Sequence, residues 1–281
     1  MKLVFLVIVV AGRSVAQDSL QATVRIQEPD GFTTRRVVAT GLVGGILVGS
    51  LISSYFDWWK DSAEPFHVVR EGIFSDYSRG IDKIGHAYTS YFYFNTFRNI
   101  MLWGGHDRST AFWWAAGTTA FFSLSIEIGD GVSPYGFSFE DLAFNMGGLG
   151  YGMLQSAIPF LSNFNFKWSY VPRDGYRWPP RFTDHYDSHT YWLSVKMHEL
   201  LPSPLQKYWP EFLQLAVGYG VDENQTKREG VIGLDFNLEI FPVHNPELQI
   251  LQKTANMIHL PAPAVKFTEQ KKPKYYLFHT N

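Results

Sequence analysis

Three apolar segments of the sequence carry polar side chains at helical spacing near one end. The pairs are Asp82 with His86, Glu127 with Asp130, and Asp141 with Asn145. Because residues three or four positions apart share one face of a helix, each pair would project in a single direction. Carboxylates and imidazoles bind divalent metals and also exchange protons with substrates. Such groups are unfavourable at an apolar boundary unless they are paired, so their positions predict a shared polar site.

One interpretation of this site is a polar network that locks the helices together. Lys83, His86 and Asn145 would then satisfy the acids through ion pairs and hydrogen bonds. Ser138 would cap its helix through a Ser-x-x-Asp pattern that ends at Asp141. In this reading the cluster stabilises the fold and performs no chemistry.

The other interpretation is a site for a divalent metal such as Zn, Mn or Mg. Its ligands would be Asp82, His86, Glu127 and Asp141. Asp130 would be the general base that activates a water molecule. An ammonium group at Lys83 would repel a bound cation, unless that side chain points outward. The residue types leave both interpretations open.

A second candidate metal motif lies in the stretch TDHYDSHTYW. It contains Asp184, His185, Asp187 and His189. On a helix, the two histidines, four residues apart, could clasp a metal. The Pro-Pro pair just upstream and the aromatic composition favour a loop, in which solvated or stacked histidines are the commoner outcome. We therefore rank this motif behind the first.

Four apolar segments would position the first site, at residues 37–56, 84–103, 110–128 and 139–161. The first has twenty residues without a charge, which is the length needed to cross the hydrocarbon layer of a membrane. An up-and-down arrangement brings the polar ends of the other three together. The sequence therefore predicts a mainly α fold, with a four-helix membrane-type bundle over residues 35–166.

Glycines recur every four residues along the first apolar segment, at Gly41, Gly45 and Gly49. They would line one face of a helix. In lipid, a stripe of small residues lets another helix backbone approach closely. We therefore expect helix packing along this stripe.

The N-terminal residues 1–16 are typical of a signal peptide, with one lysine, an apolar run and a small-x-small site. Residues 17–34 are polar and should form an extended arm. A cleaved signal would place Arg35 and Arg36 on the exported side, against the positive-inside rule for inner-membrane proteins. We therefore expect a bacterial envelope protein, in the outer membrane or on the periplasmic side.

The remainder, residues 167–281, is predicted to be rich in loops, with a short helix at 191–200 and a loosely held tail. Two runs flank the polar turn DENQTKRE and predict a β-hairpin over 212–241. In the second run, apolar Leu234 and Phe236 alternate with polar Asp235 and Asn237, which indicates one buried face. Apolar residues at helical spacing predict a helix over 246–260.

Three stretches, DKIGHAYTSYF, SIEIGDG and GFSFEDLAFNMGGLGYG, resemble the YfiM-like family of predicted periplasmic lipoproteins and, more distantly, the VanZ-like membrane proteins. The matching positions are Asp82, Lys83, His86, Glu127, Asp130, Ser138, Asp141, Asn145 and Gly148. The resemblance covers about residues 35–160 and implies an envelope location. It implies no activity, because the first family has none assigned and the second is associated only with glycopeptide resistance. The chain has no cysteine, so it cannot be acylated as a lipoprotein is, and its anchoring must differ.

These observations favour a non-enzymatic envelope protein that aids envelope assembly or integrity, in contact with membrane lipid and a protein partner. The alternative is a metal-dependent hydrolase that acts on a lipid-linked or cell-wall substrate. A net charge of −2 gives no basic field for nucleic acid. A divalent metal is the cofactor that would separate the two functions.

Overall fold

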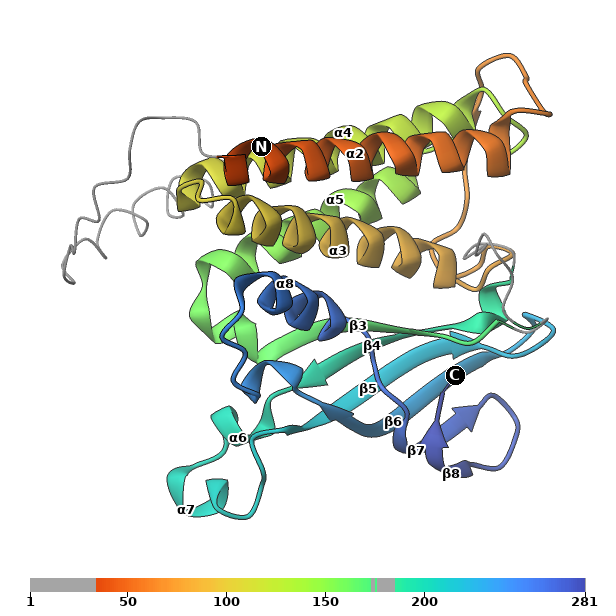
Figure 1. Cartoon of the computed structure of the whole chain (residues 1–281). Coiled ribbons are helices and arrows are strands. Elements are labelled where there is room, and N and C mark those ends of the chain that lie inside the picture. Colours follow the sequence, from red (N-terminus) through yellow and green to blue (C-terminus); the bar gives the residue numbers. More distant parts are fainter. Residues whose placement is uncertain (1–33, 173–174, 176–184, 281) are drawn as a thin grey trace, which may run out of the picture.

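The computed structural model describes residues 34–172, 175 and 185–280. The predicted signal peptide, the arm except for its last residue, and Asp184 lie outside these residues. Within them, the chain forms a layer of long helices stacked on a curved antiparallel sheet (Figure 1).

All four predicted apolar segments are helical. They form α2 (Thr34–Ser54), α3 (Ile81–Trp103), α4 (Arg108–Gly131) and α5 (Phe139–Ala157), and a π-helical turn, Tyr55–Trp59, continues α2. Figure 1 shows α3 between the other long helices and the sheet, and α3 packs against β3, β4 and β5.

The sheet contains six strands that neighbour one another in chain order. They are β3 (Phe164–Tyr170), β4 (His189–Val195), β5 (Leu213–Val221), β6 (Arg228–Phe236), β7 (Ala262–Thr268) and β8 (Lys274–His279). The predicted hairpin is present as β5 and β6, in register from Leu213 opposite Phe236 to Val221 opposite Arg228. A separate parallel pair joins β1 (Val68–Val69) to β2 (Phe137–Ser138).

Short helices lead into the sheet or connect its strands. They are the 3₁₀ turns Pro159–Asn163, Tyr186–Ser188 and Leu238–Ile240, and the α-helices α6 (Met197–Leu200), α7 (Ser203–Gln206) and α8 (Pro246–Ala255). The helix predicted over 246–260 thus ends at Ala255. The helix predicted at 191–200 is wrong, because its first five residues pair with β3 and β5 as part of β4.

The predicted fold class, a four-helix membrane-type bundle, is wrong. The described residues include the six-stranded sheet, and only one helical stretch among them, Thr34–Trp59, is long and apolar enough to cross a membrane by length and composition. Strand β3 lies where the predicted bundle gives way to loops, and β7 and β8 both lie in the predicted tail. Each has six or seven residues and is stabilised by pairing with another strand, which local composition does not reveal.

The sheet is strongly curled, because an inward side chain of β3 reaches β6. Lys167 Nζ lies 2.6 Å from Asp235 Oδ2, although β4 and β5 separate the two strands. In a flat sheet three strand spacings amount to about 14 Å, which is beyond the reach of a lysine. The segment after α8 closes the interior, since Ile258 bridges to Trp168 and the His259 ring stacks on Trp192 with centroids 3.8 Å apart.

The predicted burial of the hairpin is inverted. Asp235 is fully buried and Asn237 is buried, whereas the apolar Ile232 of the same strand is 49% exposed. The reason is that the polar face of β6 lines the curled interior, where Lys167 neutralises Asp235. The apolar face of β6 is turned away from that interior.

Close packing in the helix layer occurs at a glycine outside the predicted stripe. A Cβ atom on Gly148 of α5 would lie 1.8 Å from the carbonyl oxygen of Ala87 in α3, so only glycine allows these two backbones to approach. A Cβ on Gly41, Gly45 or Gly49 would meet nothing within 4 Å. The helix packing expected along the α2 stripe is therefore not made with any described part of the chain, and it stays a prediction about another molecule.

Candidate functional site

The loop before α3 fixes the first group of polar residues. Gly80 adopts a φ of 83°, and its amide donates to Asp76 Oδ1 at 2.7 Å. The amide of Asp82 donates to Ser78 Oγ at 3.3 Å, which satisfies one free N–H of the first helical turn. This arrangement begins α3 at Ile81 and places Asp82, Lys83 and His86 at the start of the helix.

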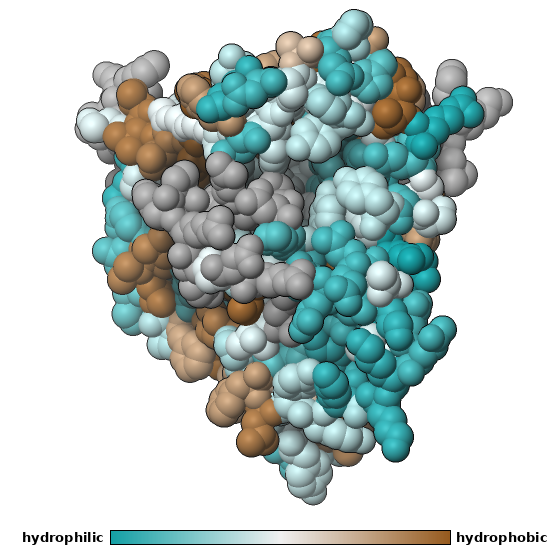
Figure 2. Space-filling model, turned by 90° about the vertical axis from the view of Figure 1, so that its right-hand side faces the viewer, coloured by the Kyte–Doolittle hydropathy of each residue, from teal (hydrophilic) through white to brown (hydrophobic). Residues whose placement is uncertain are grey.

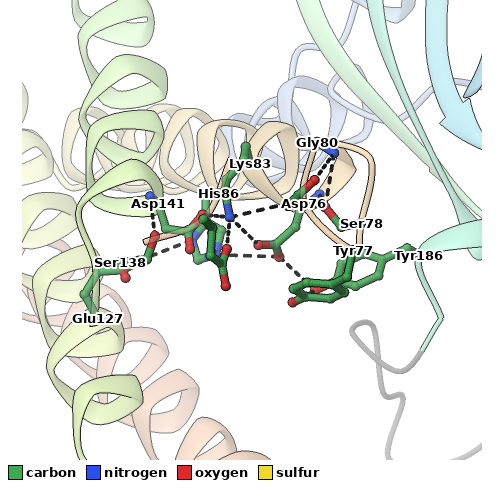
Figure 3. Close-up of polar contacts among 12 residues, drawn as sticks. Asp76, Tyr77, Ser78, Gly80, Lys83, His86, Glu127, Ser138, Asp141 and Tyr186 are labelled. Carbon is green, nitrogen blue, oxygen red and sulfur yellow. Dashed lines mark hydrogen bonds and ion pairs between the residues drawn. The ribbon is translucent and has the colours of Figure 1, made fainter. Parts of the chain in front are cut away.

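The second and third groups come from the end of α4 and the start of α5. Ser138 caps α5 by accepting from the amide of Asp141 at 3.1 Å, which is the Ser-x-x-Asp contact expected from the sequence. The turn between the two helices is closed by the amide of Gly136, which donates to the carbonyl of Asp130 at 2.9 Å. The three helix ends therefore meet, as the up-and-down arrangement predicts (Figure 3).

Lys83 lies at the centre of the cluster and its side chain is fully buried. Its ammonium group contacts Glu71, lies 2.8 Å from Asp141 Oδ1 and 3.4 Å from Asp82 Oδ2, and is 3.7 Å from Asp76 Oδ2. Burial by itself lowers the pKa of Lys83, but hydrogen bonds to Asp141 and Glu71 outweigh it and raise the pKa above the ordinary value. Lys83 is therefore a permanent buried cation.

His86 lies beside this ion cluster and links it to α4 and α5. Its Nε2 is 3.7 Å from Asp82 Oδ1, and its Nδ1 is 3.5 Å from Glu127 Oε1 and 3.1 Å from the amide nitrogen of Asn145. Asn145 donates to Glu127 at 3.0 Å. Burial lowers the pKa of His86, but the surrounding charges of Asp82, Asp141 and Glu127 raise it overall.

Two acids of α4 are held partly protonated. Burial is the main cause that raises the pKa of Glu127 to about 8 and that of Asp130 to about 6. Asp130 Oδ1 also accepts from Trp59 Nε1 at 2.8 Å. These carboxyl groups can therefore exchange protons near neutral pH, as a general acid or base must.

The cluster forms one wall of a cavity of about 740 Å³ between the helix layer and the sheet. The acids that line it are Asp57, Glu71, Asp82, Asp130 and Asp141, and the aromatic residues include Trp58, Tyr88, Phe92, Tyr93, Phe122, Trp168 and Tyr191. Two tyrosine side chains also reach the cluster. Tyr186, just before β4, donates to Asp82 Oδ1 at 3.0 Å, and the Tyr77 hydroxyl lies 3.0 Å from the Tyr186 hydroxyl (Figure 3).

The predicted metal ligands are only partly grouped. Ligand atoms of Asp82, His86 and Asp141 lie within 4.8 Å of one another, as do those of Glu71, Asp76 and Asp82. Glu127 is outside both groups and bonds to Asn145 instead. Lys83 does not point outward; its ammonium group lies against both sets of acids, where it repels a divalent cation.

The second predicted metal motif is not helical. Tyr186–Ser188 forms a 3₁₀ turn and His189 begins β4, so the helical spacing of the two histidines does not apply. His189 accepts from Trp168 Nε1 at 2.9 Å and lines the cavity. Neither His185 nor His189 belongs to a metal-ligand group among the described residues.

Sequence reasoning missed Glu71, Asp76 and Tyr186. The first two precede α3 in the polar stretch REGIFSDYSRG, which has no helical spacing, and Tyr186 lies more than a hundred residues away. The pattern Asp76-x-Ser78-x-Gly80 is typical of a helix start and is the signal that could have drawn attention to this loop.

The comparisons with known proteins bear on the helical part of the chain. A family model described as predicted periplasmic lipoprotein (DUF2279) matches residues 70–157. These residues contain Lys83 and all four acids around it, and they stop before β3. No curated protein and no solved structure matches the chain significantly. The comparisons do not support the VanZ-like resemblance. The chain is thus an exported protein on the periplasmic side of the cell envelope, similar over residues 70–157 to predicted periplasmic lipoproteins for which the family description gives no activity.

Proposed function

We propose that this protein is a non-catalytic binding protein of the envelope, and that its cavity binds an organic cation with an apolar body. The observation that carries the proposal is the composition of the cavity, which combines an acidic wall with aromatic walls in a volume of about 740 Å³. Ligand sites of proteins are commonly 300–1,000 Å³ and mostly apolar with a few placed polar groups, so the size fits a small amphiphile.

The charge of the acidic wall selects the sign of the ligand. Five carboxyl groups line the cavity, and the basic groups beside them are Lys83 and His86. With both bases charged, the wall keeps about two to three negative charges, because burial raises the pKa of Asp130 to about 6 and leaves that carboxyl group partly protonated near neutral pH. An anion would be repelled, and a cation would complete the neutralisation.

The aromatic walls supply the second part of the recognition. The faces of Trp, Tyr and Phe rings attract ammonium groups through their quadrupoles, with about 0.5–2 kcal/mol for each good contact. Trp58 and Tyr93 come from the helix layer, while Trp168 and Tyr191 come from the sheet. A ligand whose ammonium group lies at the acidic wall would therefore have its apolar body between the helix layer and the sheet. A role in envelope assembly or integrity would follow from binding such a molecule.

The test is a titration with octyltrimethylammonium, with octyl sulfate as the anion of equal chain length. Binding is measured by isothermal titration calorimetry on the full chain in a non-ionic detergent. The cation should bind at least tenfold more tightly than the anion. Asp130→Asn keeps an acceptor for Trp59 and removes one charge, and should weaken cation binding roughly tenfold, or on the order of 1.4 kcal/mol.

Asp61→Asn is the matched control, because Asp61 is largely exposed and does not line the cavity. Its affinity should equal that of the unchanged protein. Equal affinity for the two amphiphiles, or equal affinity of the Asp130→Asn protein and the control, would refute the proposal.

The metal-dependent hydrolase is the second candidate, and the grouping of Asp82, His86 and Asp141 favours it. In that function these three residues hold the metal, and Asp130 at the cavity wall is the general base. The buried ammonium group of Lys83 opposes it. Metal analysis of the purified protein separates the two candidates: a stoichiometric transition metal that is lost in His86→Ala would favour the hydrolase, and its absence would favour the binding protein.

A further inference from the structure

A band without charge runs across the outer surface of α2. Residues 37–56 contain no charged residue and, at 1.5 Å each, extend over about 30 Å. One face of the helix packs on α3 and α4 through residues such as Ala39 and Val43. The opposite face leaves Val48 and Ile52 more than half exposed. This degree of exposure is unfavourable for aliphatic side chains in water.

Helix α4 runs parallel to α2 and carries an uncharged stretch of similar length. Residues 109–126 are uncharged, and Trp113, Trp114 and Phe121 are more than half exposed. The two helices end at the same levels. Trp59 bonds to Asp130 at one end, and Arg36 donates to the carbonyl of Gly105 at the other. The two uncharged stretches therefore lie side by side.

The sheet continues the band with an unusual polarity. Leu193, Val217 and Ile232 are cross-strand neighbours on the face turned away from the curled interior, and each is 44–54% exposed. The inward face holds the buried polar residues Lys167 and Asp235 beside the apolar Trp192 and Val231. A sheet with one face in water normally buries its apolar side chains and exposes its polar ones. The outward face is apolar as well. Its Tyr191 packs on Tyr88 of α3, but Leu193, Val217 and Ile232 are left uncovered, which indicates an apolar medium beside them.

Charged residues gather at the two ends of the band. Arg35, Arg36, Arg108 and Glu247 lie at one end, and Asp57, Lys60, Asp61 and Glu64 at the other. The sheet ends level with the helices, since Arg228 at the start of β6 donates to the carbonyl of Phe74 in the loop before α3. Figure 2 faces the right-hand end of Figure 1. It shows hydrophilic residues over most of its right side, and hydrophobic ones along its left side, in its lower middle and at its upper right.

We propose that this band, formed by α2, α4 and the outward faces of β4, β5 and β6, lies in the hydrocarbon core of a lipid bilayer. The occupant of these faces is acyl chain rather than a protein partner. A partner usually covers one patch of about 800 Å² per side. The band instead extends over both layers of the molecule. Its uncharged stretches of twenty residues in α2 and eighteen in α4 are about 30 and about 27 Å long, close to the thickness of bilayer hydrocarbon. The proposal is independent of what the cavity binds.

The absence of cysteine from the sequence makes a direct test practical. Single cysteines replace Val48, Phe121 and Ile232 in the middle of the band, and Asp61→Cys is the control at one charged end. Each full-length variant is labelled with a polarity-sensitive fluorophore and reconstituted into phosphatidylcholine vesicles. Quenching by aqueous iodide is then compared with quenching by a lipid that carries a nitroxide on its acyl chain.

Labels in the band should be quenched by iodide at least tenfold less than the label at residue 61, and strongly by the nitroxide lipid. A label at Val217→Cys checks the sheet face if Ile232→Cys fails to fold. Iodide access to the band labels equal to that at residue 61 would overturn the proposal, as would release of the protein from vesicles by alkaline carbonate. Protection of the band from both quenchers would identify a protein as the occupant and would also overturn it.

Discussion

Replacing Lys83 by methionine tests whether the buried ion cluster holds the three helix ends together. Methionine keeps most of the volume of the side chain but removes the ammonium group that Asp141 and Glu71 share. Glu71 would then lose the ammonium group that it contacts, and Asp141 would keep only the His86 ring, 4.0 Å from its Oδ1, in a site where Lys83 itself is fully buried. Breaking a buried ion pair in this way destabilises a protein by about 3–5 kcal/mol.

The matched control is Lys60→Met. The Lys60 ammonium group lies 3.7 Å from Asp61, and both side chains are largely exposed, at 44% and 84%. An exposed pair of this kind contributes at most about 1 kcal/mol. At about 2–4 °C per kcal/mol, Lys83→Met should lower the melting temperature by roughly 10 °C, and Lys60→Met by less than about 4 °C.

The assay is thermal unfolding followed by circular dichroism in a mild non-ionic detergent. Asp141→Asn and the double variant complete a thermodynamic cycle, because the loss of one charge should make the loss of the other less harmful. The coupling energy should be about 1–3 kcal/mol. A Lys83→Met protein as stable as Lys60→Met, or two effects that simply add, would refute the structural role of the cluster.

Two further predictions concern the same helix ends. Gly148→Ala should lower the free energy of unfolding by about 3 kcal/mol, because the added Cβ would overlap the Ala87 carbonyl. The control Gly147→Ala, whose Cβ meets open space, should be neutral or slightly stabilising. Equal stability of the two variants in chemical denaturation would contradict the packing. The folded state raises the pKa of Glu127 from 4.5 to about 8 and raises that of His86 above 6.5, so it binds more protons than the unfolded chain. The free energy of unfolding should therefore fall as the pH rises from about 5 to 8, and less so in Glu127→Gln; a rise over this range would count against the buried positions of these groups.

The sequence alone determined the helices and much of the cluster. Long apolar segments fold locally into helices, because the backbone hydrogen bonds are made within the segment. Spacings of three and four residues then put Asp82 beside His86 on one turn, and alternation of helix direction placed Glu127 and Asp141 at the same end. The hairpin β5–β6 was visible for a similar reason, since its two strands are joined by one short turn.

Only the tertiary structure decided the sheet and the environment of the cluster. Strands β3, β7 and β8 are short. Strand β3 pairs with β4 and β7 pairs with β6, each across a long intervening segment, and β8 pairs only with β7 at the edge of the sheet, so their stability comes from contacts that local composition does not reveal. The curl of the sheet reversed the expected burial of Asp235 and Ile232, because Lys167 arrives from three strands away. The position of Lys83 among four acids depends on the loop that brings Glu71 and Asp76 to it. Contacts within one turn of a helix follow from the spacing of residues in the sequence. Contacts between loops and strands instead depend on how distant segments of the folded chain pack together.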